Sequence, residues 1–435
     1  MKMRFWRAEL SEADGSCPPL RPRGTRPTNI SIDNGDLIRS WAASMKHSIE
    51  SLGLDSARER REFLRVMAFG LVAGPAVLPC STLVQDTANP ARGAQPLPGP
   101  GMPGPFPGQI VEVKSRNVIS NYRVNSVVVS KMIELGMMEL TGAATPLKAW
   151  QTFVNKDDVV AIKVNASGLP YCVSSPEIIL EIIRALNEVG IPPQHIYLYE
   201  RYTEQLDLVG YYAYVPERVR VVGLDGSRLQ LGGFDKDIYA ERSFFGEEET
   251  RSYLATLLSQ VVTKIINVPN LKDHSAAGVT GCLKNIGYGS FDNVARSHKI
   301  PTTQTKIFIG QLCSMEPLRS KTVLQIMDGL RGVYHGGPFA RNRNFIWYPG
   351  LIYVGTDPVA IDRIELDVVE AKRKEVGAVS LWDRSPENLA PEMVYVENPR
   401  KNLFIREPEH IQYAGSLGLG VYELEKIKFK QIIVT

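Results

Sequence analysis

Cysteine is scarce in this sequence and is not clustered. Five cysteines occur among 435 residues, and no two of them have the C-x-x-C spacing. A ferredoxin-type iron–sulfur cluster needs four closely placed thiolates, so we expect no such cluster here. The six histidines include no H-x-x-x-H pair. The usual sequence signs of a metal centre are therefore missing, and the identity of any bound metal stays open.

A strong excess of either charge is also missing. Lys and Arg total 50 against 47 Asp and Glu, which gives a formal net charge of +3. Nucleic-acid-binding domains usually present a strongly basic face, so we expect no nucleic-acid partner. A nearly neutral chain can still hold a local site for an anion.

The apolar run at 66–78 is too short to span a membrane, which takes about 18 apolar residues. It follows the basic segment RREFLR at 60–65. A basic segment before a short apolar stretch is typical of an export signal. Adjacent arginines followed by x-Phe-Leu resemble the twin-arginine export signal. The alternative is a basic turn before a short core helix.

The twin-arginine resemblance implies a bacterial or archaeal protein that is exported after folding, with the twin-arginine translocation machinery as a partner. We expect it to be periplasmic or attached to the outer side of the inner membrane. The signal segment is 59–83, after an extension at 1–58 in which Met45 is an alternative start. Residues 84–109 are rich in proline and glycine and predict an extended linker. The folded body is then 110–435.

The body alternates between strand and helix patterns. Apolar runs at 157–165 and 195–200 predict strands on either side of a helix at 174–190. In that helix Ser174 and Glu177 have capping-box spacing, and Gly190 suits the C-terminal stop. Strand, helix, strand predicts a βαβ unit and therefore parallel strands.

Further apolar runs lie at 218–225, 261–270, 305–310, 322–329 and 351–362, with a helix beginning after Asp357. We therefore expect one α/β body with a mostly parallel sheet and flanking helices, and a β-rich insertion at about 225–250. Many of these runs end in polar residues. Ligands bind at the carboxyl ends of strands in such sheets, so these polar residues predict a site.

Several motifs then occur in the order known from one family: KVN, NVPNLKDH, GVTGCLKNIGYG, MDGLRG, GTDPVAID and YAGSLGLG. In this respect the chain resembles the domain of unknown function 362 family over about 155–425. The resemblance implies an α/β fold but no settled activity. Some members carry a fused ferredoxin module. The cysteines of this sequence do not have the spacing that such a module needs.

The glycine-rich segment GVTGCLKN at 278–285 is the centre of the predicted site. Gly278 and Gly281 permit close approach of a ligand to the backbone. A helix starting near Thr280 would favour an anion at its N-terminus. We therefore predict that a small carboxylate or phosphate is bound by a set of polar residues: Lys163, Asn165, Asn267, Asn270, Lys272, Thr280, Lys284, Asn285 and Asp357. The alternative is a glycine-rich turn with solvated lysines, and for Asp357 a helix cap.

His274 and Asp328 are the candidates for proton transfer. His274 is also a candidate metal ligand, together with Asp273, Asp328, Asp357 and either His298 or His335. Three hypotheses stay open. In the first, the chain is an exported protein that binds a small acidic molecule or acts on it as an enzyme. Alternatively, it is an accessory or assembly factor for a redox or metal enzyme, or a metalloprotein loaded before export.

Overall fold

The computed structural model describes residues 99, 101–226 and 232–435. The predicted extension, signal segment and most of the linker lie outside these residues. No helix in the described part of the chain is long and apolar enough to cross a membrane.

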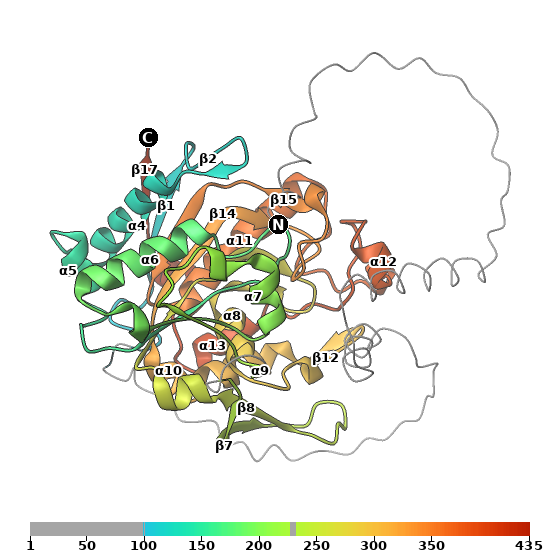
Figure 1. The fold of residues 1–435 in the computed structure, drawn as a ribbon. Helices are drawn as coiled ribbons and strands as arrows, with labels where there is room; N and C mark the ends of the chain where they lie inside the picture. The colour runs from blue at the N-terminus through green and yellow to red at the C-terminus, as the bar shows by residue number, and fades with distance from the viewer. Residues whose placement is uncertain (1–98, 100, 227–231) are drawn as a thin grey trace, which may run out of the picture. The chain divides into compact units, whose positions relative to one another are not determined.

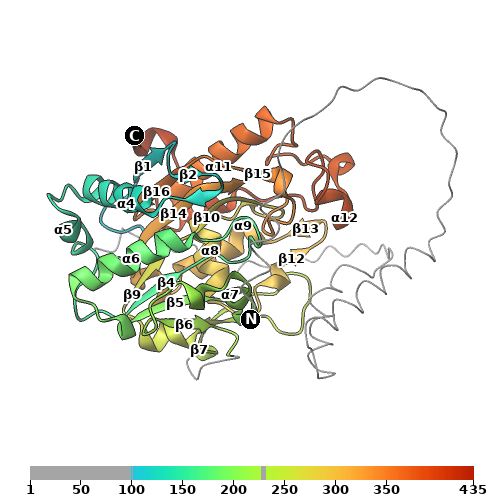
Figure 2. The ribbon, with the colours of Figure 1, turned by 45° about the horizontal axis from the view of Figure 1, so that its top comes forward.

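One mixed sheet organises the described residues (Figures 1 and 2). Its strand order is β17-β1-β16-β14-β9-β4-β5-β6, with β10, β11 and β15 paired beside this path. These strands are β1 (Gln109–Ser115), β4 (Val160–Lys163), β5 (Ile196–Glu200), β6 (Arg220–Gly223), β9 (Lys264–Asn267), β10 (Asn270–His274), β11 (Gly278–Val279), β14 (Thr322–Val333), β15 (Ile346–Trp347), β16 (Leu351–Gly355) and β17 (Lys428–Val434).

Five neighbouring strands of this sheet, β14, β9, β4, β5 and β6, run parallel. β16 is antiparallel to both β14 and β1, whereas β17 is parallel to β1. The register places the last residue of β4, Lys163, beside Asn267 of β9 and Tyr199 of β5. The prediction of a mostly parallel α/β sheet is confirmed, and the strand ends meet at one edge.

The helices of the described residues are α4 (Ser126–Thr141), α5 (Pro146–Trp150), α6 (Pro176–Val189), α7 (Thr203–Val209), α8 (Gly281–Ser290), α9 (Thr305–Ser314), α10 (Leu318–Lys321), α11 (Pro358–Glu375), α12 (Glu392–Tyr395) and α13 (His410–Ser416). Short paired strands lie outside the main sheet: β2 (Ile119–Ser120) with β3 (Arg123–Val124), β7 (Phe234–Glu241) with β8 (Arg251–Ala255), and β12 (His298–Lys299) with β13 (Thr302–Thr303).

The sheet has an apolar core on each face. Helices α4 and α6 pack together over one face, and Val160 and Ile162 of β4 contribute to that core. Helices α8, α9, α11 and α13 contact one another and form the other core with Ala161 of β4. Successive residues of a strand point to opposite faces. A parallel strand covered on both faces is therefore apolar on both, as β4 is from Val160 to Ile162, before the strand ends at Lys163.

The βαβ prediction for β4, α6 and β5 is confirmed, and Gly190 ends α6 in a left-handed conformation. The predicted capping box is wrong. Ser175 is the N-cap, whereas the Ser174 hydroxyl donates to the Val268 carbonyl and accepts from the Asn165 N–H. Ser174 thus connects α6 to two strand ends.

The apolar run at 305–310 is not a strand. It begins α9, and its buried residues recur with helical spacing: Thr305, Phe308, Ile309, Leu312 and Cys313. Short apolar runs do not distinguish a strand from a buried helix. The predicted β-rich insertion corresponds to the β7–β8 pair, which begins somewhat later, at Phe234.

Asp357 is the N-cap of α11, and its carboxylate also joins two distant segments to this helix. Its Oδ1 accepts from the Ala360 N–H at 2.9 Å. Its Oδ2 accepts from Gly108 at 2.8 Å, before β1, and from Val421 at 2.9 Å. The side chain is fully buried. These contacts agree with the alternative interpretation of Asp357 as a helix cap.

We expect Asp357→Ala to lower the free energy of unfolding by about 3 kcal/mol or more, because it removes a cap and leaves buried N–H groups unpaired. Asp367→Ala is the matched control on the same helix. Asp367 is exposed and pairs only with Arg363, so its loss should change stability by about 0.5 kcal/mol at most. Urea unfolding of both variants measures the difference. Equal small effects would contradict the role given to Asp357.

Candidate functional site

A buried ion pair lies where β4 and β5 end. The Lys163 Nζ donates to Glu200 Oε1 at 2.7 Å and to the Val164 carbonyl at 2.5 Å. The other carboxylate oxygen of Glu200 accepts from the Ala166 N–H at 2.9 Å. Burial lowers the pKa of Lys163, and Glu200 opposes that shift. The pair holds two strand ends and the following loop together.

The Asn285 side chain of α8 connects this pair to β9. Its Oδ1 accepts from Asn165 Nδ2 at 3.0 Å and lies 3.4 Å from Lys163 Nζ. Its Nδ2 donates to Asn267 Oδ1 at 2.7 Å. Asn267 in turn donates to Gln325 of β14 at 2.8 Å. One amide thus links the ends of β4 and β9 to α8.

Lys272 of β10 is buried beside the same network. Its Nζ donates to Asn165 Oδ1 at 2.7 Å, and to Ser167 Oγ and the Pro338 carbonyl at 3.0 Å each. These three acceptors are neutral. Burial lowers the pKa of Lys272 to about 8, although more distant acidic groups raise it. The ammonium is fully hydrogen-bonded but has no carboxylate in direct contact among the described residues.

The N-terminus of α8 is already occupied by a carboxyl group of the chain. The Asp362 carboxylate of α11 accepts from the Cys282 N–H at 2.5 Å and the Leu283 N–H at 2.9 Å. A Cβ at Gly281 would lie 2.4 Å from the Asp362 carboxyl carbon, and Gly281 has a φ of +54°. Burial raises the pKa of Asp362 to about 7. The helix end predicted for an external anion is thus filled by a side chain.

Lys284 and Arg201 are half-buried cations near this network. Lys284 Nζ lies 4.3 Å from the centre of the Tyr288 ring, and the Arg201 guanidinium lies 4.9 Å from that of Tyr202. Among the described residues neither cation has a carboxylate within ion-pairing distance. Burial, and then the charges of Lys272 and Arg201, lower the pKa of Lys284 to about 7.

Three histidines lie within the electrostatic reach of Lys284. Burial, and then the Lys284 charge, lower the pKa of His274 well below its ordinary value and that of His298 to about 3. The rings of His274 and His298 are 5.8 Å apart. Burial also lowers the pKa of His410 to about 4. All three imidazoles are therefore neutral at physiological pH.

His274 has a defined tautomer. Its Nδ1 accepts from the N–H groups of Ala276 at 3.0 Å and Ala277 at 3.2 Å. An acceptor nitrogen carries no proton in a neutral imidazole, so the proton is on Nε2. That nitrogen is a hydrogen-bond donor.

The other predicted residues are buried but engaged elsewhere. Asp328 accepts from the Ser175 N–H at 2.7 Å and the Leu330 N–H at 3.0 Å, and burial raises its pKa. Among the described residues, the Thr280 hydroxyl donates only to the Asp273 carbonyl, at 3.5 Å. Asn270 pairs through its backbone with Asp328, and its Oδ1 has no partner among the described residues.

The residues considered for a metal do not gather. Asp328 and Asp357 hold backbone N–H groups in different places, and His335 packs between Phe345 and Tyr395 with ring centres 4.8 Å apart in each case. Within the described ranges, no group of three or more His, Cys, Asp or Glu side chains is arranged to hold a metal ion. Cys172, Cys282 and Cys313 are buried and free.

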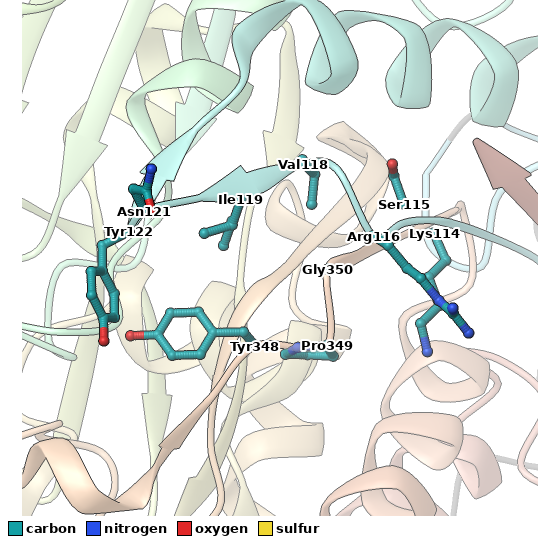
Figure 3. A pocket seen from close by; sticks show the side chains of 10 residues that line it. All are labelled: Lys114, Ser115, Arg116, Val118, Ile119, Asn121, Tyr122, Tyr348, Pro349 and Gly350. Carbon is teal, nitrogen blue, oxygen red and sulfur yellow. The ribbon is translucent and has the colours of Figure 1, made fainter. Parts of the chain in front are cut away.

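A hollow of about 600 Å³ lies away from this network (Figure 3). It is lined by the segment after β1 and by the residues before β16, among them Arg116, Tyr122 and Tyr348. In Figure 3 the Tyr348 hydroxyl points toward Tyr122. Strands β16, β14 and β9 separate β1 from β4 in the sheet. The hollow therefore shares none of the polar network's residues.

Residues 160–367 match the model of a family described as a domain of unknown function, DUF362. The chain carries a DUF362 domain. The match lies within the range 155–425 over which the motifs resemble the family, and it ends before the last motif, YAGSLGLG. It contains the hydrogen-bonded residues of the strand ends: Lys163, Asn165, Glu200, Asn267, Lys272 and Asn285. No curated protein matches the sequence.

A crystal structure of a protein from Thermotoga maritima, a structural-genomics target, is among the solved structures that resemble this one. The identity is 10%, the TM-score is 0.34, and the match covers 58% of this chain and 59% of that chain.

Hydrogen bonds connect some of the predicted site residues to one another: Lys163, Asn165, Asn267, Lys272 and Asn285. Sequence reasoning placed Glu200 and Arg201 at the strand ends only through the general pattern of polar termini. It missed Ser167, Asp362 and His410 as members of the site. The available signal for Glu200 was its position as the last residue of the β5 strand, whereas Asp362 and His410 come from distant helices.

Gly289 of α8 makes room for Lys163, since a Cβ there would lie 2.0 Å from Lys163 Cε. We expect Gly289→Ala to displace Lys163 from Glu200 and to lower the free energy of unfolding by about 3 kcal/mol. Gly287→Ala is the control in the same helix, because its Cβ would meet Cys313 Sγ at 3.1 Å. Alanine gains about 1 kcal/mol of helix propensity at either position. Similar stabilities of the two variants in thermal and urea unfolding would refute this packing.

Proposed function

We propose that the DUF362 domain of this chain binds a small carboxylate- or phosphate-bearing molecule at the ends of β4, β5 and β9. The observation that carries this proposal is the pair of half-buried cations, Lys284 and Arg201. Neither has a carboxylate within ion-pairing distance among the described residues, and each adds to the positive field of the other. Lys272 adds a third positive charge that only neutral groups contact.

These cations lack a negatively charged partner, and an anionic ligand would supply one. Like charges in a poorly solvated place repel one another and favour the neutral form of each base. A carboxylate or phosphate beside Lys284 and Arg201 would offset that repulsion and form charge-assisted hydrogen bonds. The N-terminus of α8 is not part of the proposed contact, because Asp362 occupies it.

The surroundings also support an enzyme that acts on the bound molecule. His274 is neutral and keeps its proton on Nε2, so it can donate a hydrogen bond to a ligand oxygen and polarise the bond to that oxygen. Asp328 is a weaker choice for contact with the ligand, since both of its oxygens accept backbone N–H groups. Of the two candidates, we therefore assign the contact with the reacting oxygen to His274.

Calorimetric titration with phosphate and with succinate tests the anion site. We expect Lys284→Ala and Arg201→Ala each to weaken binding about tenfold or more, because each removes a charge-assisted contact. The melting temperature should change little, since neither cation has an ion pair to lose. Lys306→Ala, at an exposed lysine of α9, is the control.

The affinity should also fall as pH rises through about 7. Lys284 is charged below its lowered pKa and neutral above it, and only the charged form attracts an anion. Equal losses of binding and of thermal stability would favour a structural role for Lys284. A protein that binds neither anion but copurifies with a redox or metal enzyme would favour the accessory-factor hypothesis.

We also propose that the protein is exported through the twin-arginine translocation machinery to the periplasm or the outer side of the inner membrane. The support is the RREFLR segment before the apolar run at 66–78. Replacing Arg60 and Arg61 together with lysine should leave the folded protein in the cytoplasm of a bacterial host. Cell fractionation and immunoblotting measure this. A doubly substituted chain that is exported as well as the unsubstituted one would contradict the proposal.

A further inference from the structure

The three lysines of the site differ in what their amino groups contact. Lys163 is held by Glu200 and by a carbonyl. Lys272 donates all three of its protons to neutral acceptors. Lys284 has no hydrogen-bond acceptor among the described residues, and its Nζ rests against the face of the Tyr288 ring. Of these three amino groups, only that of Lys284 is therefore available to react.

The surroundings of Lys284 favour its neutral form. Its neighbours Lys272 and Arg201 are cationic, and no acidic group contributes to its pKa. A lysine that is desolvated and lies next to other cations is the kind that attacks carbonyl groups. Because its pKa is lowered to about 7, a much larger share of the Lys284 amino groups is neutral at pH 7 than for an ordinary lysine, whose pKa is about 10.4.

We propose that Lys284 forms an imine with a small 2-oxo acid. This inference rests on the proposed anion site. The carboxylate of the 2-oxo acid would be the bound anion, with Arg201 in contact with it and the charge of Lys272 attracting it. The carbonyl carbon lies next to that carboxylate in such a molecule, so binding of the acid brings the carbonyl to the amino group. Phosphate would occupy the same site without reacting.

The chemistry balances without an oxidant or a reductant. The lone pair of neutral Nζ attacks the carbonyl carbon, a C–N bond forms, and the carbonyl π electrons move to oxygen. That oxygen takes up one proton that Nζ releases, and His274 Nε2–H donates a hydrogen bond to it. The carbinolamine then loses its hydroxyl group together with the remaining Nζ proton, as water. Amine and ketone become imine and water, and both protons of neutral Nζ leave in that water.

Borohydride trapping tests the imine. The full chain is incubated with pyruvate, reduced with sodium borohydride, and examined by intact-mass and peptide mass spectrometry. We expect one reduced pyruvate per chain, located on Lys284, and competition by phosphate. Peptide mapping of the unsubstituted protein identifies the lysine even if a variant fails to fold.

Two variants separate the imine from the anion site. Lys284→Arg keeps the positive charge, so it should bind phosphate more tightly than Lys284→Ala, but neither variant should form an adduct. Lys306→Arg should form the adduct as the unsubstituted protein does. Calorimetric binding of pyruvate without an adduct would overturn the imine and leave the anion site standing. Absence of any binding would overturn both, and an adduct spread over exposed lysines would overturn the specific role of Lys284.

Discussion

The buried ion pair between Lys163 and Glu200 is the interaction on which the rest of the site depends. Two charges removed from water are costly unless they contact each other and their remaining polar atoms are satisfied. Here the ammonium also meets a carbonyl, and the carboxylate also receives a backbone N–H. The requirement for close contact fixes the ends of β4 and β5, and Asn285 then brings α8 into register with them. The positions of Lys272 and Lys284 follow from that arrangement.

The two remaining lysines show how one kind of side chain takes different properties from its neighbours. Both are desolvated, and burial lowers the pKa of both. Lys272 is surrounded by oxygen acceptors, which stabilise a charged, immobile ammonium. Lys284 faces an aromatic ring and other cations, which do not. One residue is therefore suited to shape an electrostatic field, and the other to exchange a proton or react within that field.

Much of the fold follows from local sequence patterns. The apolar run Val160–Ile162 of β4, the apolar stripe of α6 and the Gly190 stop predict a βαβ unit. The polar residues at the strand ends predict which edge of the sheet is polar. The errors have physical causes. Residues 305–310 are apolar enough for a strand, but their buried positions continue with helical spacing to Cys313. Ser174 was placed in a capping box, yet its hydroxyl meets β-strand ends that are close only in the folded chain. Asp362 reaches α8 from about 80 residues away, so no local pattern indicates that it fills that helix end.

That long separation has a consequence for how the protein is made. Helix α8 has no anion at its N-terminus until α11 has been synthesised and docked, and β1 finds its partners in β16 and β17 near the other end of the described chain. A nascent chain that stops before residue 362 would thus expose an incomplete sheet and an uncapped α8. Contacts between residues far apart in sequence also slow folding, because a long loop must close before they form. We therefore expect the polar network to mature late, after translation has finished, and to require protection from aggregation in the interval.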